Sequence, residues 1–222
     1  MKLDFSSVWQ YWPFLYHGAL TTLKITAITA VFGFLLGVLL SLIKISKCRP
    51  LVWFGNFYTS IFRGTPLLVQ LCIVHFGLPQ LTGMTLTTMQ SGVLTFSLNS
   101  AAYISEIFRG GINAIDRGQY EAAMSLGVGY RDMMKDIILP QAVKHILPSL
   151  VNEAISLLKE SSILSYIGAV ELLRAADQIT VLTFRFFEPY LVIAVIYYVL
   201  VMLLSMVASW IERWVSRSDR VL

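Results

Sequence analysis

Three glutamates and one lysine lie well inside long apolar stretches of this sequence. They are Glu106, Glu153, Lys159 and Glu160. A charged side chain at the centre of a lipid bilayer costs about 2.5–3.5 kcal/mol on insertion scales, so it normally faces protein or water. A carboxylate in such a place can bind a cationic group, which makes the three glutamates candidates for a polar site within a membrane.

The spacing of these residues predicts how two helix faces meet. Asn99 and Glu106 are seven residues apart, as are Glu153 and Glu160, so each pair shares one face of a helix. At 1.5 Å per residue, Asn99 and Glu160 are expected about 10 Å from one membrane surface, and Glu106 and Glu153 about 20 Å from it. We therefore expect both faces to line one cavity. The predicted substrate contacts are Glu153, Asn99, Ser156, Glu160 and Ser100.

Each buried charge also has a purely structural interpretation. Glu106 precedes Arg109 by three residues, and an ion pair with Arg109 and Arg63 at a helix end is the favoured reading. Glu153 has no basic residue within one turn of its own helix, and its alternative role is an interhelical hydrogen bond. Lys159 points about 100° away from Glu160 and is expected to snorkel or to pair elsewhere. No Cys/His cluster indicates a metal site.

A second pattern lies in a polar stretch between two apolar runs. Glu121-Ala122-Ala123 is followed after three residues by Gly127, and after nine more by Ile137-Ile138-Leu139-Pro140. The pattern predicts a helix-turn-helix whose first helix covers residues 119–126, with a glycine turn. Small side chains would let the first helix approach a partner closely. Taken alone, alanines and a glutamate are ordinary on a solvated helix. The resemblance described below implies partner contacts at Glu121, Ala122, Ala123, Leu126 and Gly127.

Composition places these residues in a membrane protein. The chain of 222 residues is 56% hydrophobic and 14% charged, with a mean hydropathy of +0.70, which excludes a soluble domain of this size. Cys48 and Cys72 fall in separate segments, so no disulfide is expected. The first seventeen residues are rich in aromatic side chains and predict a helix lying on the outer membrane surface, not a cleavable signal peptide.

Five membrane spans can be proposed from the apolar runs. The first, residues 22–43, contains Gly33 and Gly37, a small-residue face suited to close helix packing. The second is interrupted: residues 51–62 are expected as an interfacial lead-in, and residues 67–78 as the span, with Thr65 as N-cap and Pro66 as first helical residue. The other spans are residues 92–108, 142–166 and 189–211.

Basic residues orient the chain. Twelve of the seventeen Lys and Arg residues fall on one side: Lys44, Lys47, Arg49, Arg63, Arg109, Arg117, Arg131, Lys135, Lys144, Arg213, Arg217 and Arg220. The positive-inside rule places this side in the cytoplasm and the N-terminus outside. The net charge of +4 follows from this asymmetry, so no nucleic-acid partner is expected.

The polar pattern resembles the EAA loop of bacterial ATP-binding-cassette (ABC) importer permeases, E-A-A, three residues, G, nine residues, I-x-L-P. Further motifs, in residues 62–70, 99–112, 152–162 and 187–190, resemble the polar amino acid branch of these permeases. The likeness extends over about residues 21–212. It implies an all-α membrane protein with five transmembrane helices, the type I ABC importer permease fold, an outer N-terminus and a cytoplasmic C-terminus. We treat residues 1–222 as one transmembrane domain, with its core at 18–215 and a cytoplasmic coupling loop at 109–145.

The resemblance also implies partners. Two copies of this chain, or one copy with a close paralogue, would pair in the bacterial cytoplasmic (inner) membrane as a multi-pass protein, in contact with lipid. An ATPase dimer and an extracytoplasmic substrate-binding protein would complete the importer. The chain has no G-x-x-x-x-G-K-[ST] loop, so we expect it to bind no cofactor and to be no enzyme, with ATP and Mg used by the ATPase.

The acidic character of the inward-facing polar set favours a basic amino acid, arginine, lysine or histidine, as substrate. Permeases of the same class for glutamine, glutamate or cystine remain an alternative. An ion-coupled transporter or a channel is the competing class, against which stand the EAA loop and a five-span chain without an inverted repeat. A helix expected at residues 170–179 would close the outer mouth. Its charged residues Glu171, Arg174 and Asp177 would contact the binding protein or face solvent.

Overall fold

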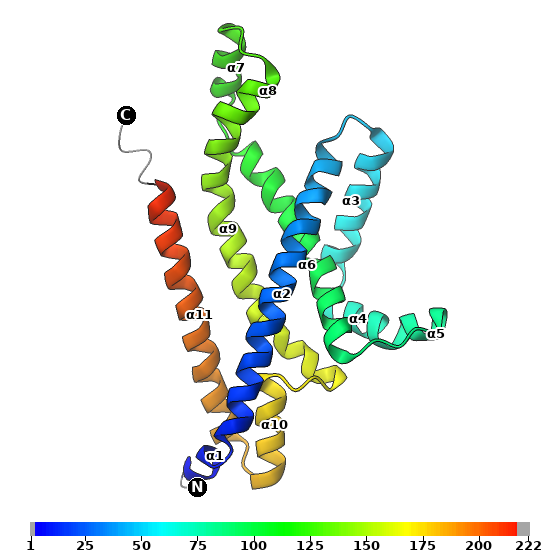
Figure 1. Ribbon diagram of the computed structural model, residues 1–222, viewed down its shortest axis with the longest axis vertical. Coiled ribbons are helices and arrows are strands. Elements are labelled where there is room, and N and C mark those ends of the chain that lie inside the picture. The colour runs from blue at the N-terminus through cyan, green and yellow to red at the C-terminus, as the bar shows by residue number, and fades with distance from the viewer. Residues whose placement is uncertain (1–2, 217–222) are drawn as a thin grey trace.

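The computed structural model describes residues 3–216, and within that range every regular element is helical (Figure 1). The α-helices are α1 (Ser6–Trp9), α2 (Trp12–Ile45), α3 (Arg49–Gly64), α4 (Leu67–Cys72), α5 (Leu78–Thr82), α6 (Thr88–Asn113), α7 (Arg117–Ser125), α8 (Tyr130–Asp132), α9 (Leu139–Glu160), α10 (Leu172–Thr183) and α11 (Phe187–Ser216). Two π-helical segments, η1 (Ile73–Gly77) and η2 (Met133–Ile138), and one 3₁₀ segment, η3 (Ser161–Ile167), connect them. The predicted all-α class is confirmed.

Helices α2 and α6 form the most extensive pair and cross closely, as Figure 1 shows. A Cβ atom at Gly33 would lie 2.9 Å from Ser100 Cβ, and one at Gly37 would lie 2.6 Å from Ile104 Cγ2. Such distances leave no room for a side chain, so the glycines set the spacing of the two helices. The small-residue face of α2 therefore packs against α6 of the same chain.

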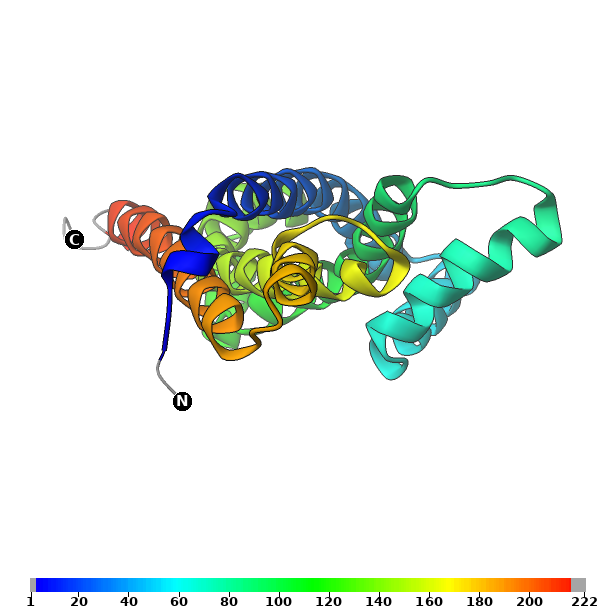
Figure 2. The ribbon, with the colours of Figure 1, turned by 90° about the horizontal axis from the view of Figure 1, so that it is seen from below.

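Helix α6 runs through the middle of the bundle, with α2, α3 and α9 packed around it (Figures 1 and 2). Its buried positions are mostly small or polar, including Thr95, Ser97, Ser100 and Ser105. Because these residues meet other helices, α6 has little need of a continuous apolar surface. By length and composition, the described residues contain two helices that could cross a membrane, residues 12–45 and 187–211, or three if the bent pair α3 and α4–α5 counts as one. The five-span count stays a prediction.

The N-terminal segment differs from its prediction. Only Ser6–Trp9 forms a separate short helix, and α2 already begins at Trp12, ten residues before the predicted start of the first span. Pro13 stands in the first turn of α2, where a missing N–H costs nothing. The aromatic residues of this segment are therefore divided between α1 and the first turns of a continuous helix.

The structure has the break in the second span at the predicted place. Which of its two halves crosses the membrane stays a prediction. The axes of α3 and of the α4–α5 segment meet at 104°. Figure 1 shows α3 running beside α2, whereas α4 and α5 extend sideways from the bundle. Thr65 precedes a proline and is extended, as such residues prefer, so it ends α3. Pro66 is extended too and is itself the N-cap of α4, so the predicted Thr65 cap is wrong.

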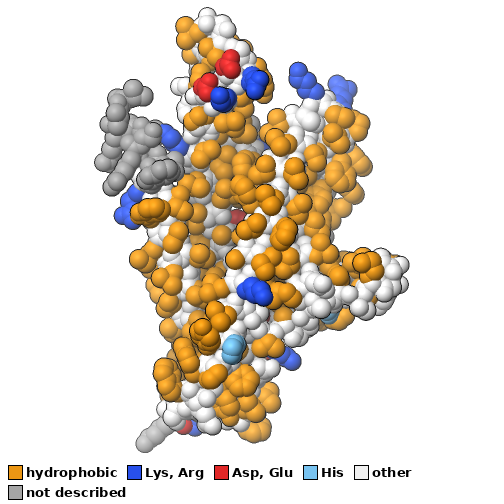
Figure 3. All heavy atoms as spheres, in the orientation of Figure 1, with side chains coloured by type: hydrophobic (Ala, Val, Ile, Leu, Met, Phe, Trp, Pro, Cys, Tyr) orange, Lys and Arg blue, Asp and Glu red, His pale blue; other side chains and the backbone are white. Residues whose placement is uncertain are grey.

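The two ends of the bundle differ in charge. Figure 3 shows Lys and Arg side chains around the end that carries α7, α8 and the α2–α3 connection, and a broad apolar surface along the bundle. Only 11% of the apolar window of α11 is buried. These features agree with a membrane protein whose α7–α8 end is basic, and the cytoplasmic placement of that end remains a prediction. Lys2, Arg217 and Arg220 lie outside the described residues.

Candidate functional site: an intramembrane carboxylate and a polar hairpin

Three helices meet at Glu153. The Ser100 hydroxyl of α6 donates a 2.7 Å hydrogen bond to Oε1 of Glu153 on α9. Ser100 is fully buried, and Gly33 of α2 leaves the space that its hydroxyl occupies, since a Cβ there would lie 3.0 Å from Ser100 Oγ. The Glu153 side chain is half-buried. The interhelical hydrogen bond considered for Glu153 is therefore present, and its donor is one of the predicted site residues.

The predicted register between α6 and α9 is wrong by about two turns. Asn99 was expected level with Glu160, yet its neighbour Ser100 contacts Glu153. The depth estimate assumed that both helices run straight across the membrane from assumed ends at residues 92 and 166. In the structure α6 starts at Thr88, α9 ends at Glu160, and α6 crosses the bundle obliquely (Figure 1).

Asn99 does not join Ser100 at Glu153. Its Nδ2 donates to the backbone oxygen of Phe62 and to Oε1 of Gln70, both at 3.0 Å. Gln70 Nε2 in turn donates to the oxygen of Phe62 at 2.8 Å and to the oxygen and hydroxyl of Thr65. These two buried amides replace the backbone hydrogen bonds that are lost where α3 breaks. Asn99 thus holds the bend of the second span, and its predicted substrate contact would require this brace to open.

Ser156 and Glu160 follow Glu153 by three and seven residues on α9, and both are half-buried. This spacing keeps them on the side of α9 that carries Glu153. Ser161 is fully buried and donates to the oxygen of Leu158, and Ser162 donates to the oxygen of Lys159, so these hydroxyls are occupied locally. The predicted site therefore reduces to Glu153, Ser100, Ser156 and Glu160.

Glu106 belongs to a separate ion cluster, as the favoured structural interpretation predicted. Arg109 Nη2 lies 2.6 Å from Glu106 Oε2 and Arg63 Nη1 lies 3.7 Å from the same atom. Lys44 of α2, which the sequence gave no reason to include, is buried and forms an ion pair with Oε1 of Glu106. Its ammonium group also donates to Thr59 Oγ1 at 3.3 Å. Three basic side chains already surround both oxygens of Glu106, so this carboxylate is not available to a substrate.

The polar loop forms the predicted hairpin. Helix α7 covers Arg117–Ser125, with Asp116 as N-cap accepting from the Gly118 N–H. Gly127 has φ +73°, a left-handed conformation that favours glycine. The N–H groups of Gly127 and Val128 donate to the oxygens of Met124 and Ala123, both at 3.0 Å. This pattern is a Schellman motif, which ends the helix and turns the chain.

The predicted partner contacts divide into two groups. Glu121, Ala122 and Leu126 are exposed, with Leu126 at 82%. Ala123 is 2% exposed and packs with Met133 and other residues of the hairpin, so it supports the hairpin from inside. This corrects the expectation that both alanines face a partner. Met124, 62% exposed, was missed, although its place one helical turn from Tyr120 and Val128 could have indicated it.

A cavity of about 650 Å³ opens between α7 and the end of α6. Its lining includes Ile112, Asn113, Arg117, Tyr120, Glu121 and Met124. The combination of a cavity, exposed apolar side chains and a fixed turn gives this end of the molecule a shaped surface for another protein.

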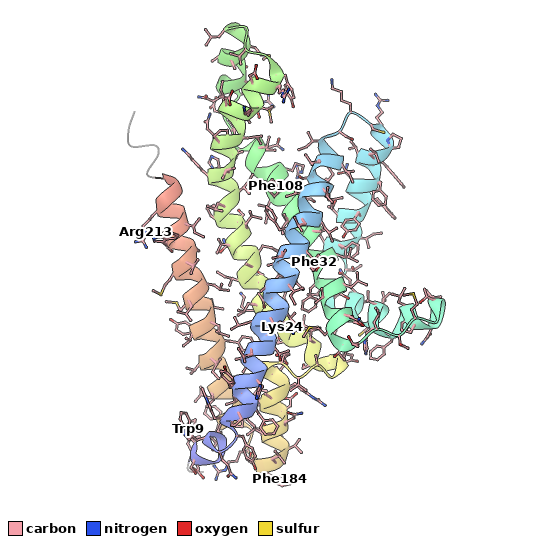
Figure 4. The ribbon with its side chains drawn as sticks, in the orientation of Figure 1. Trp9, Lys24, Phe32, Phe108, Phe184 and Arg213 are labelled. Atoms are coloured by element: carbon pink, nitrogen blue, oxygen red, sulfur yellow. The ribbon has the colours of Figure 1, made fainter. Side chains whose placement is uncertain are left out.

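The opposite end is closed by α10, which starts two residues later and ends four residues later than predicted. Glu171 is fully buried and caps α10, accepting from the N–H groups of Leu173 and Arg174 and from Tyr197 Oη. Burial raises the pKa of the Glu171 carboxyl, and the three donors act against that shift. Glu171 therefore joins α10 to α11 and offers no contact to a binding protein. Figure 4 shows Trp9 and Phe184 at this same end.

Comparison with known proteins gives consistent similarities. Residues 31–217 match the family described as "Binding-protein-dependent transport system inner membrane component". The chain is 51% identical to the arginine transport system permease protein of Bacillus subtilis (strain 168), over 99% of this chain and 100% of that protein. It is 50% identical to a putative glutamine transport system permease protein of Rickettsia felis, over 90% and 92%. A crystal structure of an amino acid ABC transporter with histidines superposes with a TM-score of 0.92 at 45% identity, covering 96% of this chain and 99% of that one.

Proposed function

The chain belongs to the family of inner membrane components of binding-protein-dependent transport systems, and we propose that it imports basic amino acids: arginine, lysine or histidine. It is a multi-pass inner-membrane protein and the permease subunit of an amino acid ABC importer. In this family the ATPase is a separate subunit, and a binding protein is a further partner.

The environment of Glu153 carries the substrate assignment. Among the described residues, its one hydrogen bond comes from the neutral Ser100 hydroxyl, and no Lys or Arg pairs with it. Glu106, by contrast, has three cations around it. A carboxylate within a membrane and without a cation is costly, and the guanidinium or ammonium group of a basic amino acid would balance its charge. Ser156 and Glu160 would extend the contact along α9.

A permease for glutamine, glutamate or cystine is the second candidate. The 50% identity to a putative glutamine permease is close to the 51% identity to an arginine permease, so sequence similarity does not separate them. An amide substrate could also donate to Glu153 and accept from Ser100. The charge of Glu153 is what favours the basic substrate.

Transport requires a link to ATP hydrolysis, and the α7 hairpin is the proposed docking site for the ATPase. Glu121, Ala122 and Leu126 supply the exposed surface, Gly127 the turn, and Ala123 the internal support. ATP and Mg would bind the ATPase dimer. We further propose that two copies of this chain pair as a homodimer, with a close paralogue as the alternative partner.

The test uses the complete importer purified with its ATPase. Binding of radiolabelled arginine, glutamine and cystine would be compared in the wild type, in Glu153→Gln and in Asp132→Asn, an exposed acid of α8 that serves as control. We expect arginine to bind most tightly, and Glu153→Gln to weaken it at least tenfold while basal ATP hydrolysis is unchanged. Preference of the wild type for glutamine, or full arginine binding by Glu153→Gln, would contradict the assignment of a basic amino acid as the substrate.

A further inference from the structure

The ion cluster on α6 carries more positive than negative charge. Lys44 alone balances the charge of Glu106, and it is bound to Oε1. Both guanidinium groups, of Arg109 and Arg63, approach the other oxygen, Oε2, at 2.6 Å and 3.7 Å. Two guanidinium groups near one carboxylate oxygen repel each other, and a second anion between them would offset this repulsion. The described residues supply no such anion.

The unused donors of this cluster face a cavity of about 610 Å³ between α3 and α6. The side chains of Arg63 and Arg109 are 45% and 53% exposed. Within residues 3–216, Arg63 makes no hydrogen bond: it lies 3.7 Å from Glu106 and stacks over the Tyr103 ring at 5.4 Å. Polar side chains of α3 complete the lining, namely Asn56, Thr59 and Ser60.

We propose that this cavity binds the phosphate group of an anionic phospholipid. A phosphodiester carries one negative charge shared by two oxygens, which two guanidinium groups can bind together, and the Asn56 amide and Ser60 hydroxyl of α3 can donate to the same oxygens. Phe57 and Ile61, on the adjoining face of α3, are 51% and 44% exposed and would contact the acyl chains. Lys44 of this cluster lies one residue before the end of α2, next to the α2–α3 connection, where basic side chains gather (Figure 3).

A carboxylate of the transported amino acid fits this cavity less well. Ser100 and Glu106 are six residues apart on α6, which places them about 120° apart around the helix. Ser100 meets α2 and α9, whereas Glu106 meets α2 and α3. The arginine cluster and the Glu153 site therefore open on different faces, so the lipid site does not depend on the proposed substrate.

The test measures lipid retained by the permease–ATPase complex. Native mass spectrometry of the wild type, purified from membranes and supplied with phosphatidylglycerol, should show one bound anionic lipid per permease chain. In the double variant Arg63→Gln, Arg109→Gln, the fraction of permease chains with bound lipid should fall at least tenfold. Arg131→Gln with Lys135→Gln removes the same charge from the exposed hairpin and should retain it. Photoactivatable phosphatidylglycerol should crosslink to peptides of α3 and α6 in the wild type, which tests the site without a substitution.

Several outcomes would overturn the proposal: no lipid on the wild type, equal occupancy in the double variant, or crosslinks elsewhere. Displacement of phosphatidylglycerol by free arginine would assign the cavity to the transported amino acid instead. Displacement by inorganic phosphate alone would show an anion site without lipid selectivity, which also contradicts the assignment. Failure of arginine binding at Glu153 would leave these lipid measurements unaffected, so the two proposals fail separately.

Discussion

The hydroxyl of Ser100 donates to Oε1 of Glu153 at 2.7 Å, joining α6 and α9 where Gly33 of α2 packs against Ser100. This bond fixes the direction of a carboxylate that has no cation among the described residues. A serine here orients the glutamate without supplying a positive charge, whereas a lysine or arginine would pair with it from within the protein. The arrangement is suited to a site that receives its positive charge from a ligand.

Ser100→Ala should weaken substrate binding without unfolding the protein. A typical hydrogen bond contributes about 0.5–1.5 kcal/mol, so losing the donor and the orientation it imposes should lower arginine affinity by up to about tenfold. Ser105→Ala is the matched control, because Ser105 is equally buried on α6 but donates to its own helix, to the oxygen of Ala102. Equilibrium binding of labelled arginine compares the two. Equal affinities would show that Ser100 is only a packing residue.

Gly33→Ala should separate α2 from α6. The added Cβ would lie 2.9 Å from Ser100 Cβ, so the helices must shift, at a cost of about 1–3 kcal/mol. Gly110→Ala adds the same methyl group to a helix where nothing lies within 4 Å, and it should be neutral or slightly stabilising. Thermal unfolding of the two purified variants gives the comparison. A Gly33→Ala protein as stable as Gly110→Ala would mean that the contact relaxes freely.

Gln70→Leu should loosen the bend between α3 and α4. The substitution removes the donor to the oxygens of Phe62 and Thr65 and the acceptor for Asn99, so that Asn99 alone still donates to Phe62; each lost hydrogen bond costs about 0.5–1.5 kcal/mol. Gln80→Leu, at an exposed position of α5, is the control. Hydrogen exchange of residues 62–72 should rise in the first variant alone. Unchanged exchange would show that Asn99 holds the bend by itself.

The break in the second span illustrates what the sequence could and could not predict. The Gly64-Thr65-Pro66 run located the break, because a residue before proline avoids helical geometry. The direction of the next segment depends on Gln70 and Asn99, whose side chains meet only through the fold. Local propensity does not carry that information, so the sequence could not predict the 104° angle between the two halves.

The candidate site, too, was predictable in its residues but not in how the helices that carry them pack. Glu153 and Ser100 were chosen because polar residues in apolar helices are rarely accidental. The register between their helices was wrong, since it depends on where α6 and α9 cross. Lys44 was missed because it ends the first apolar run and looks like an ordinary loop cation. In the structure the Lys44 side chain packs against Gly55 and points inward to Glu106.

Ala122→Leu and Ala123→Leu should affect coupling by different routes. Ala122 is exposed, so a leucine there changes only the surface offered to the ATPase and should reduce substrate-stimulated ATP hydrolysis in a stable permease. Ala123 is 2% exposed within the hairpin, so a leucine should overpack it and destabilise the fold by about 1–3 kcal/mol. ATPase assays and thermal unfolding separate the two effects. Normal stimulation in Ala122→Leu would place the docking contact elsewhere on α7.

The turn at Gly127 provides the sharpest test of the hairpin. Gly127 has φ +73°, where an alanine costs about 1–2 kcal/mol, and Gly127→Pro additionally removes the N–H that donates to Met124. Gly129, two residues later, has φ −63°, which alanine adopts without strain. We expect Gly127→Ala to reduce copurification of the ATPase, Gly127→Pro to abolish it, and Gly129→Ala to leave it unchanged, with insertion in the membrane normal in all three. If Gly127→Pro retained substrate-stimulated ATP hydrolysis, the hairpin would not be the route by which ATP drives transport.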